Sequence, residues 1–462
     1  MPLEAKYQYT HFIYPFVIDE KKYTCFIKSL LDNENNWILN FDKYNADDQL
    51  YDFFLPYMKM FLFPTLQLSD EDIKNFKQLD STKKAKMLSL TSCFSFNYNL
   101  LDMKSGHVMG KQYEAINFDI SNIRLICFKP GICFFDIKAQ VDTDKDIIEF
   151  NKILDFNHEF RLLTPKIIKN NFKKIKGNNI DNVEDIAIFI KSIISGYESK
   201  DINKIYYDKM FTYSYICVDE KYWTNDEDFQ KIENDFYKLQ YVMDGKNNTQ
   251  FNKNCEGLYE TTYSRWKYSI FGFSPESGVV MVSDKDKYNI TRMPYDFEKT
   301  YMYMMFLALY QKISLINFSQ ELLKADRTMV SKLNKKLAEF TNYSWFSQIT
   351  NSKHGNDIWQ KWQQAFKLVP LYEEVHKEYI EYYNMVKEAN QEKINLIFML
   401  LYITSIIISG FSIQIMYTGQ QEKWIYMIIM GLILLVACIY PVYLIARKIK
   451  YKIEKKSKGR RL

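Results

Sequence analysis

The chain is poor in the short motifs that mark enzymes and metalloproteins. It has only five histidines among 462 residues, and none belongs to an HExxH pattern or another metal-ligand spacing. The seven cysteines are scattered, odd in number and without a CxxC pair, which disfavours both a zinc site and a disulfide framework. The 14 glycines form neither a P-loop nor a GxGxxG fingerprint. We therefore expect no enzyme activity, no catalytic residues, no metal site and no covalent cofactor.

Long uncharged runs are concentrated near the C-terminal end. Residues 394–417 form a run of 24 residues without a charge, and residues 424–446 form another of 23. Each is long enough to cross a bilayer, whose hydrocarbon core takes about 20 helical residues. The backbone of a lipid-embedded segment must satisfy its own hydrogen bonds, so both runs are expected to be helices. Residues 418–423 would then form a short external loop in a multi-pass membrane hairpin.

Excess charge of one sign is also confined to one place. The formal net charge is only +5, yet residues 447–462 hold nine Lys or Arg against one Glu, so the rest of the chain is close to neutral. This distribution argues against a nucleic-acid-coating protein. A basic tail directly after a span is expected on the cytoplasmic side of the cell (inner) membrane. The short loop would then face outside, and both termini are expected in the cytoplasm. The expected lack of a signal peptide agrees with this orientation.

Residues 1–292 show the mixed periodicities of an α/β domain, which we expect to be a cytoplasmic sensor. Strands are expected at 7–18 with an interruption at Pro15, at 88–100, at 211–218 and twice within 259–282, and helices at 26–31, 47–63, 70–79, 183–197 and 228–243. The clearest local pattern is Ile123 to Val141, where Lys129-Pro130-Gly131 joins two β-rich runs and predicts a hairpin. Cys127 and Cys133 would oppose each other across it as reduced thiols.

Residues 293–393 are expected to be helical throughout and to end in a stalk. The apolar stretch from Tyr301 to Tyr310 is too short to span a membrane and predicts a buried core helix. A helix at 357–369 is expected to stop at Pro370, and the next helix to begin at Leu371. Its apolar residues recur at steps of three and four, a stripe typical of a coiled coil that continues into the first span: Tyr372, Val375, Tyr379, Tyr382, Val386 and Ala389.

The first span, 394–417, carries a polar stripe that we expect to line a pore. Its pore-lining candidates recur on one face of the helix: Asn395, Tyr402, Ser405, Ser409 and Ser412. Polar groups in lipid usually face protein or water. Small polar residues also recur where membrane helices pack, so helix packing is the alternative interpretation. The stalk favours the pore, because a helix continuous with the soluble domain can pass a movement to the span.

Five residues of the soluble domain are candidates for binding a nucleotide. Arg265 can meet a phosphate and the indole of Trp266 can stack on a base, just upstream of a turn that contains Ser274 and Ser277. Arg124, on the predicted hairpin, is a further candidate of the same kind. The alternative is an ordinary β-turn beside a core tryptophan.

This layout resembles the CorA family of pentameric divalent-cation channels, from about residue 120 onward and most closely over Leu371 to Arg447. Members of that family combine a cytoplasmic α/β domain, a stalk helix continuing into the first span, a short external loop, a second span and a basic tail. Asn395 matches the asparagine ring that the family places near the inner pore mouth. The family's Gly-Met-Asn signature, however, is replaced by Gly419-Gln420-Gln421, which puts Mg²⁺ selectivity in doubt.

The chain is more similar to a divergent branch of CorA-like proteins that accompany type III CRISPR systems and lack this signature. In that branch the soluble domain senses a nucleotide messenger, an adduct of S-adenosylmethionine and AMP, and opening of the membrane part harms the infected cell. The resemblance implies a homo-oligomeric, pentameric α+β protein with a long-helix stalk and two transmembrane helices, acting as an antiviral membrane effector or ion channel. Two alternatives stay open: a CorA-type divalent-cation (Mg²⁺) transporter, and a membrane-tethered sensor or scaffold without a pore.

Overall fold

The computed structural model describes most of the chain and divides it into two compact units. Described are residues 3–43, 50–100, 104–109, 115–142, 147–163, 174–177, 180–199, 208–252, 257, 260–325 and 329–417, with isolated positions at 425, 428, 429 and 431. The first unit comprises Met1–Lys324 and Lys335–His376, and the second comprises Ala325–Asn334 and Lys377–Leu462.

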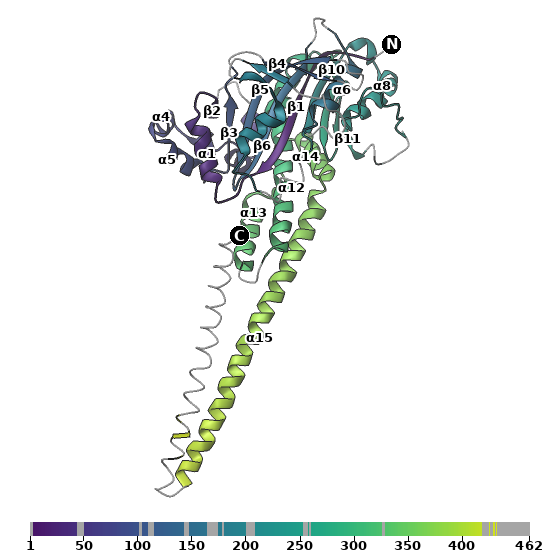
Figure 1. The fold of residues 1–462 in the computed structure, drawn as a ribbon. Helices are drawn as coiled ribbons and strands as arrows, with labels where there is room; N and C mark the ends of the chain where they lie inside the picture. Colours follow the sequence, from purple (N-terminus) through teal and green to yellow (C-terminus); the bar gives the residue numbers. More distant parts are fainter. Residues whose placement is uncertain are drawn as a thin grey trace. The chain divides into compact units, whose positions relative to one another are not determined.

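A 13-stranded mixed sheet organises the first unit (Figure 1), in the order β11-β12-β13-β10-β1-β6-β5-β4-β8-β9, with β2, β3 and β7 attached at its sides. The strands are β1 (Glu4–Val17), β2 (Trp37–Leu39), β3 (Cys93–Tyr98), β4 (Lys104–Met109), β5 (Ala115–Phe128), β6 (Ile132–Val141), β7 (Ile148–Glu149), β8 (Lys174–Gly177), β9 (Ile180–Asp185), β10 (Phe211–Val218), β11 (Thr262–Tyr263), β12 (Ser269–Phe273) and β13 (Ser277–Ser283). Strand β1 lies at the centre and pairs antiparallel with both β6 and β10. Pro15 does not interrupt it, because Pro15 lies beyond the last pairing with β10, at Ile13, and still pairs with Phe134 of β6.

The predicted hairpin is confirmed as β5 and β6, the most extensively paired strands of the sheet. Its turn holds Gly131 at a φ of +121°, a conformation that side chains other than glycine rarely adopt. A Cβ atom there would also lie 3.0 Å from the backbone oxygen of Ile18. Cys127 lies directly opposite Cys133, and both are buried free thiols, as expected.

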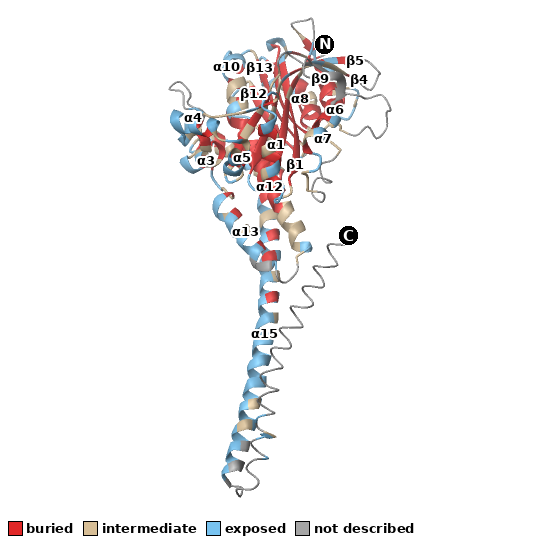
Figure 2. Ribbon diagram, turned by 60° about the vertical axis from the view of Figure 1, so that its left-hand side comes forward, coloured by how far each residue is buried: buried red, intermediate tan, exposed pale blue. Residues whose placement is uncertain are grey.

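Helices cover both faces of the sheet, so the first unit is an α+β domain with two cores. The helices of this unit include α1 (Tyr23–Asp32), α2 (Leu50–Phe53), α3 (Pro56–Leu62), α4 (Asp70–Gln78), α5 (Ser81–Leu88), α6 (Phe150–Phe160), α7 (Ile186–Ile194), α8 (Asp226–Gln240), α10 (Tyr288–Thr291), α11 (Met293–Asp296), the π-helix η3 (Phe297–Tyr301), α12 (Met302–Leu323) and α14 (Lys353–Ala365), with short 3-10 turns η1 (Pro64–Gln67) and η2 (Glu220–Tyr222). On one face, Phe12 of β1 packs against Phe156 and Phe160 of α6. On the other, Tyr9 of β1 packs against Phe297 of η3. Figure 2 shows the buried residues gathered in the sheet and in the helices packed on it.

The helix α12 is the buried core helix that its apolar stretch predicts. Every residue from Met302 to Gln311 is buried, and Phe306 and Tyr310 contact Phe134 and Phe128 of the sheet. Helix α12 therefore belongs to the soluble core.

Two predicted helix boundaries are wrong for local backbone reasons. Helix α14 ends at Ala365 rather than at Pro370, since Lys367 adopts a left-handed φ of +53° and α15 (Leu368–Tyr417) begins at once. Pro370 falls in the first turn of α15, where its missing N–H has no helical acceptor to lose. The helix expected at 47–63 is broken into α2 and α3 where Phe54 forms a β-bridge with Thr350.

The second unit contains most of α15 and the first turns of α13 (Val330–Tyr343). The predicted stripe is confirmed along α15, where Tyr379 and Val386 are buried between exposed neighbours. Tyr382 donates a hydrogen bond to the backbone oxygen of Ala325, 2.9 Å away. Side chains of the stripe therefore contact other residues of the second unit, while their neighbours on this part of α15 are exposed to solvent.

One helix of the described chain, Leu368–Gly410 of α15, is long and apolar enough to cross a membrane. No residue in its most apolar segment is buried. Figure 2 shows most of α15 as exposed. Large exposed apolar surfaces mark sites that meet protein or lipid. The expected external loop at 418–423, with Gly419, Gln420 and Gln421, the second span at 424–446 and the basic tail at 447–462 lie outside the described residues, apart from four isolated positions.

Candidate functional site

The polar stripe of the first span lies on α15, and its described side chains are exposed. Ser409 donates a 2.8 Å hydrogen bond to the backbone oxygen of Ser405, and Ser412 donates one of 2.8 Å to that of Ile408. Thr404, which lies off the stripe, makes the same kind of bond to Leu401. These bonds satisfy the hydroxyl protons within the helix, so the serines can face lipid, protein or water at modest cost. Asn395 and Tyr402 project from the same helix and are exposed.

The five ligand-binding candidates of the soluble domain do not form one site. Arg124 lies on β5, whereas Arg265 and Trp266 precede β12, and four strands separate β5 from β12 in the sheet. At about 4.8 Å between neighbouring strands, that separation is on the order of 24 Å. Arg124 and the Arg265–Trp266 pair therefore lie in separate surroundings.

Arg124 belongs to a buried ion-paired cluster beneath α12. Its guanidinium donates to Asp136 at 2.8 Å and lies 5.6 Å from the ring centre of Tyr303. The second oxygen of Asp136 is 2.7 Å from Nδ1 of His11. Burial alone would raise the pKa of Asp136, but His11 and Arg124 outweigh it and hold this pKa below its usual value. Arg124 thus has a carboxylate partner already, and its position indicates a structural role.

Ser274 and Ser277 close the turn between β12 and β13. Their hydroxyl oxygens are 2.6 Å apart, and the backbone N–H of Ser277 donates to Ser274 Oγ at 3.0 Å. Ser277 Oγ also donates to the backbone oxygen of Gln240. Both residues are buried, so their hydroxyls hold the turn and are not presented to a ligand.

Arg265 and Trp266, in contrast, lie on the surface. Trp266 is 54% exposed, which rules out the alternative of a core tryptophan at this position. The guanidinium of Arg265 lies 5.2 Å from the centre of the indole. An exposed indole with a guanidinium beside it offers a stacking face and an anion partner at one place.

His354, at the start of α14, adjoins this surface pair and joins it to the core. Its ring centre is 6.4 Å from that of Trp266. Its Nδ1 is 3.0 Å from the hydroxyl of Tyr263, which also donates to Asp357 at 3.3 Å, and its Nε2 is 3.0 Å from the hydroxyl of Tyr301. Since Tyr263 gives its proton to Asp357, Nδ1–H must donate to Tyr263, and Nε2 accepts from Tyr301.

The same surroundings keep His354 neutral. Burial, followed by the nearby charge of Arg265, lowers the pKa of His354 to about 4, against a smaller opposing effect of Asp357. A neutral histidine fits the hydrogen-bond chain, in which one ring nitrogen donates and the other accepts. The sequence offered one cue to this cluster, the spacing of His354 and Asp357 by one helical turn, but Tyr263 and Tyr301 reach it only through the fold.

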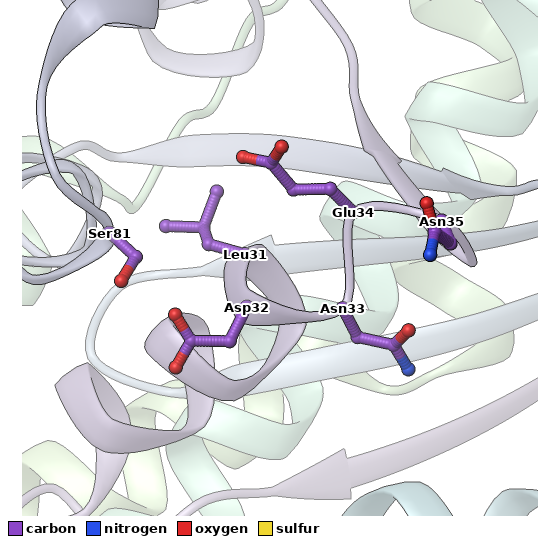
Figure 3. Close-up of a pocket in the computed structure, with 6 residues that line it drawn as sticks. All are labelled: Leu31, Asp32, Asn33, Glu34, Asn35 and Ser81. Atoms are coloured by element: carbon purple, nitrogen blue, oxygen red, sulfur yellow. The ribbon is translucent and has the colours of Figure 1, made fainter.

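A separate open hollow lies at the end of α1 (Figure 3). Its lining is mostly polar: Leu31, Asp32, Asn33, Glu34, Asn35 and Ser81. Asp32 pairs with Lys28 at 2.7 Å, and Glu34 lies 3.7 Å from Lys84. Its carboxylates already have cationic partners, and no group of three metal-ligating side chains occurs within the described ranges.

Comparison with known proteins gives no relative. No protein-family model, curated protein or solved structure matches this chain. Function is therefore inferred from the chemistry of the Arg265–Trp266–His354 cluster and from the course of α15.

Proposed function

We propose that the chain is a membrane effector whose α+β unit binds a nucleotide messenger and whose helix α15 passes the response to the bilayer. The observation that carries this proposal is the continuity of α15. Its first residue, Leu368, is fully buried in the sheet unit, and the same 50-residue helix runs without a break to the exposed apolar residues 394–417. A rigid helix anchored in a folded domain and entering lipid is suited to carry a displacement.

The Arg265–Trp266–His354 cluster is the proposed messenger site. A guanidinium pairs with phosphate through two parallel hydrogen bonds, and an exposed indole stacks on a purine. His354, whose two ring nitrogens are bonded to Tyr263 and Tyr301, packs beside the indole of Trp266 and supports it. The resemblance to the CRISPR-associated branch makes the adduct of S-adenosylmethionine and AMP the first ligand to test.

The finer architecture is part of the same proposal. Residues 424–446 form a second span, both termini lie in the cytoplasm, and copies of the chain, five in the CorA-like arrangement, surround a path lined by the stripe from Asn395 to Ser412. Binding opens this path only if the messenger has different affinities for the closed and open states. Two observations support this arrangement: the apolar surface of α15 is exposed, and its serines gather on one face.

Release of a trapped dye from vesicles tests the proposal. The full chain is reconstituted, and release is followed with the adduct, with ATP, with Mg²⁺ alone and without additions. The proposal expects release only with an adenylate messenger. Entry of Mg²⁺ without nucleotide, reported in parallel by a trapped Mg²⁺-sensitive dye, would instead establish the transporter alternative. Neither dye release nor Mg²⁺ entry in any condition would leave a membrane-tethered sensor or scaffold.

A matched pair of substitutions tests the stripe in the same assay. Ser409→Leu should block release, because it places a bulky apolar group on the proposed path. Thr404→Leu should not, although it removes a hydroxyl with the same intrahelical bond. Equal release by the two variants would contradict a pore lined by this face.

A further inference from the structure

Two cationic side chains pair with one carboxylate at the turn between β12 and β13, and a third cation, Lys312, lies in the same neighbourhood. Arg161, which follows α6, donates to Glu276 at 3.3 Å, and Lys209, which precedes β10, pairs with the other carboxylate oxygen. The ammonium of Lys312 in α12 lies 4.8 Å from the ring centre of Phe366 and 6.0 Å from that of Phe211. Phe211 precedes Thr212, whose backbone N–H donates to the backbone oxygen of Glu276 at 3.3 Å. Four separate segments of the first unit thus supply one charged cluster.

The cluster has more positive than negative charge. Among the described residues, Glu276 is the only carboxylate paired with Arg161 or Lys209, and it is the only one whose charge is felt at Lys312. Arg161 is nine-tenths buried, and its Nε has no hydrogen-bond partner within the described chain. Buried cations are ordinarily paired, since removing them from water is costly. Within the described part of the chain, one carboxylate thus serves three cations.

We propose that Arg161, Lys209 and Lys312 form a binding site for a phosphoryl dianion, which displaces the carboxylate of Glu276. A phosphoryl group brings the two negative charges that the cluster lacks and can accept hydrogen bonds from both guanidinium and ammonium groups. The side chain of Glu276 is 45% exposed and can move into water while its backbone stays in the turn closed by Ser274 and Ser277.

This site is distinct from the Arg265–Trp266–His354 cluster and goes beyond the proposed function. Glu276 follows β12, whereas Trp266 precedes it, so the two sites lie at opposite ends of the same strand. Binding of a phosphoryl group to this site is measured directly and does not depend on dye release from vesicles. A failure of one proposal therefore leaves the other intact.

Calorimetric titration of the full chain in detergent tests the site. Inorganic phosphate and AMP are titrated separately at pH 7 and low ionic strength, to distinguish free phosphate from a phosphomonoester. Wild-type protein should bind at least one of them saturably. Lys312→Met should weaken that binding about tenfold or more, the loss typical of one charge-assisted hydrogen bond, and Lys209→Gln should do the same. Glu276→Gln should tighten it, because the competing carboxylate is gone.

Lys221→Met is the matched control, since Lys221 is an exposed lysine paired with Glu4 away from the cluster. Its affinity should equal that of the wild type. A melting curve for each variant shows whether it folds. If Lys312→Met does not fold, Lys209→Gln replaces it in the comparison. No saturable binding by wild type and Glu276→Gln, or equal affinities for the Lys312, Lys209 and Lys221 variants, would overturn the proposal.

Discussion

Replacing Lys312 by methionine should stabilise the protein, because its ammonium is buried without a full counter-charge. Burial lowers the pKa of Lys312 from 10.5 to about 8, with Glu276 opposing this effect. The unfolded chain then takes up a proton as the pH falls through 10.5, while the folded chain takes it up only near 8. Stability therefore decreases from pH 10.5 to pH 8 and is constant below, at a cost of about 3 kcal/mol.

Thermal unfolding of the full chain in detergent measures this effect. Methionine keeps much of the apolar stem of Lys312 between Phe211 and Phe366 and removes the charge. For a unit of about 370 residues, 3 kcal/mol corresponds to a rise in Tm of about 4 °C at pH 7. The rise should shrink at pH 10, and Lys221→Met should show none. A lower Tm for Lys312→Met, or an equal gain at both pH values, would refute the reasoning.

Three further predictions concern the first unit. Asp136→Asn leaves buried Arg124 without its carboxylate and should cost about 3–5 kcal/mol in urea unfolding; an unchanged midpoint would contradict the ion-paired cluster. The pKa of His354 is about 4 instead of 6.5, so the unfolded state takes up its proton first, and stability should fall as the pH drops from 6.5 towards 4. His354→Gln should flatten this dependence of Tm on pH. An unchanged pH profile in that variant would contradict a buried, neutral His354. Arg265→Gln should weaken binding of the adenylate messenger about tenfold by calorimetry, while Lys267→Gln, its exposed neighbour, should not; equal effects would exclude Arg265 as the phosphate partner.

Local patterns predicted many individual elements of the sheet unit. The strand at 211–218 is β10, and the hairpin around Lys129-Pro130-Gly131 is β5 and β6. These elements are encoded by alternating apolar residues and a turn sequence that few other structures accept. The apolar stretch of α12 was also placed correctly in the core because its length is too short for a membrane.

Features that depend on tertiary contacts were not predictable. The break between α2 and α3 is set by a bridge from Phe54 to Thr350, almost 300 residues away in sequence. Pro370 was expected to end a helix, but the left-handed backbone of Lys367 lets it begin one. No periodicity within either segment contains this information.

The candidate sites were predicted only in part. Arg265 and Trp266 were found because they are adjacent in sequence and chemically suited to a nucleotide. His354 and the surplus of charge around Glu276 were missed, since their partners come from distant strands and helices. A lysine such as Lys312 looks ordinary in sequence and becomes informative only when its burial and lack of a full counter-charge are known.

The central claim, that α15 carries a signal from the sheet unit to the membrane, is tested most directly by breaking this helix between the two. Met385 is 52% exposed, so replacing its side chain removes little packing, whereas Met385→Pro disrupts the helical hydrogen bonds around it. Dye release on addition of the S-adenosylmethionine–AMP adduct is compared for wild type, Met385→Pro and the control Met385→Ala, with adduct binding measured in parallel. The account predicts that Met385→Pro binds the adduct as the wild type does but releases no dye, while Met385→Ala releases it normally. Normal adduct-dependent release by Met385→Pro would contradict the account.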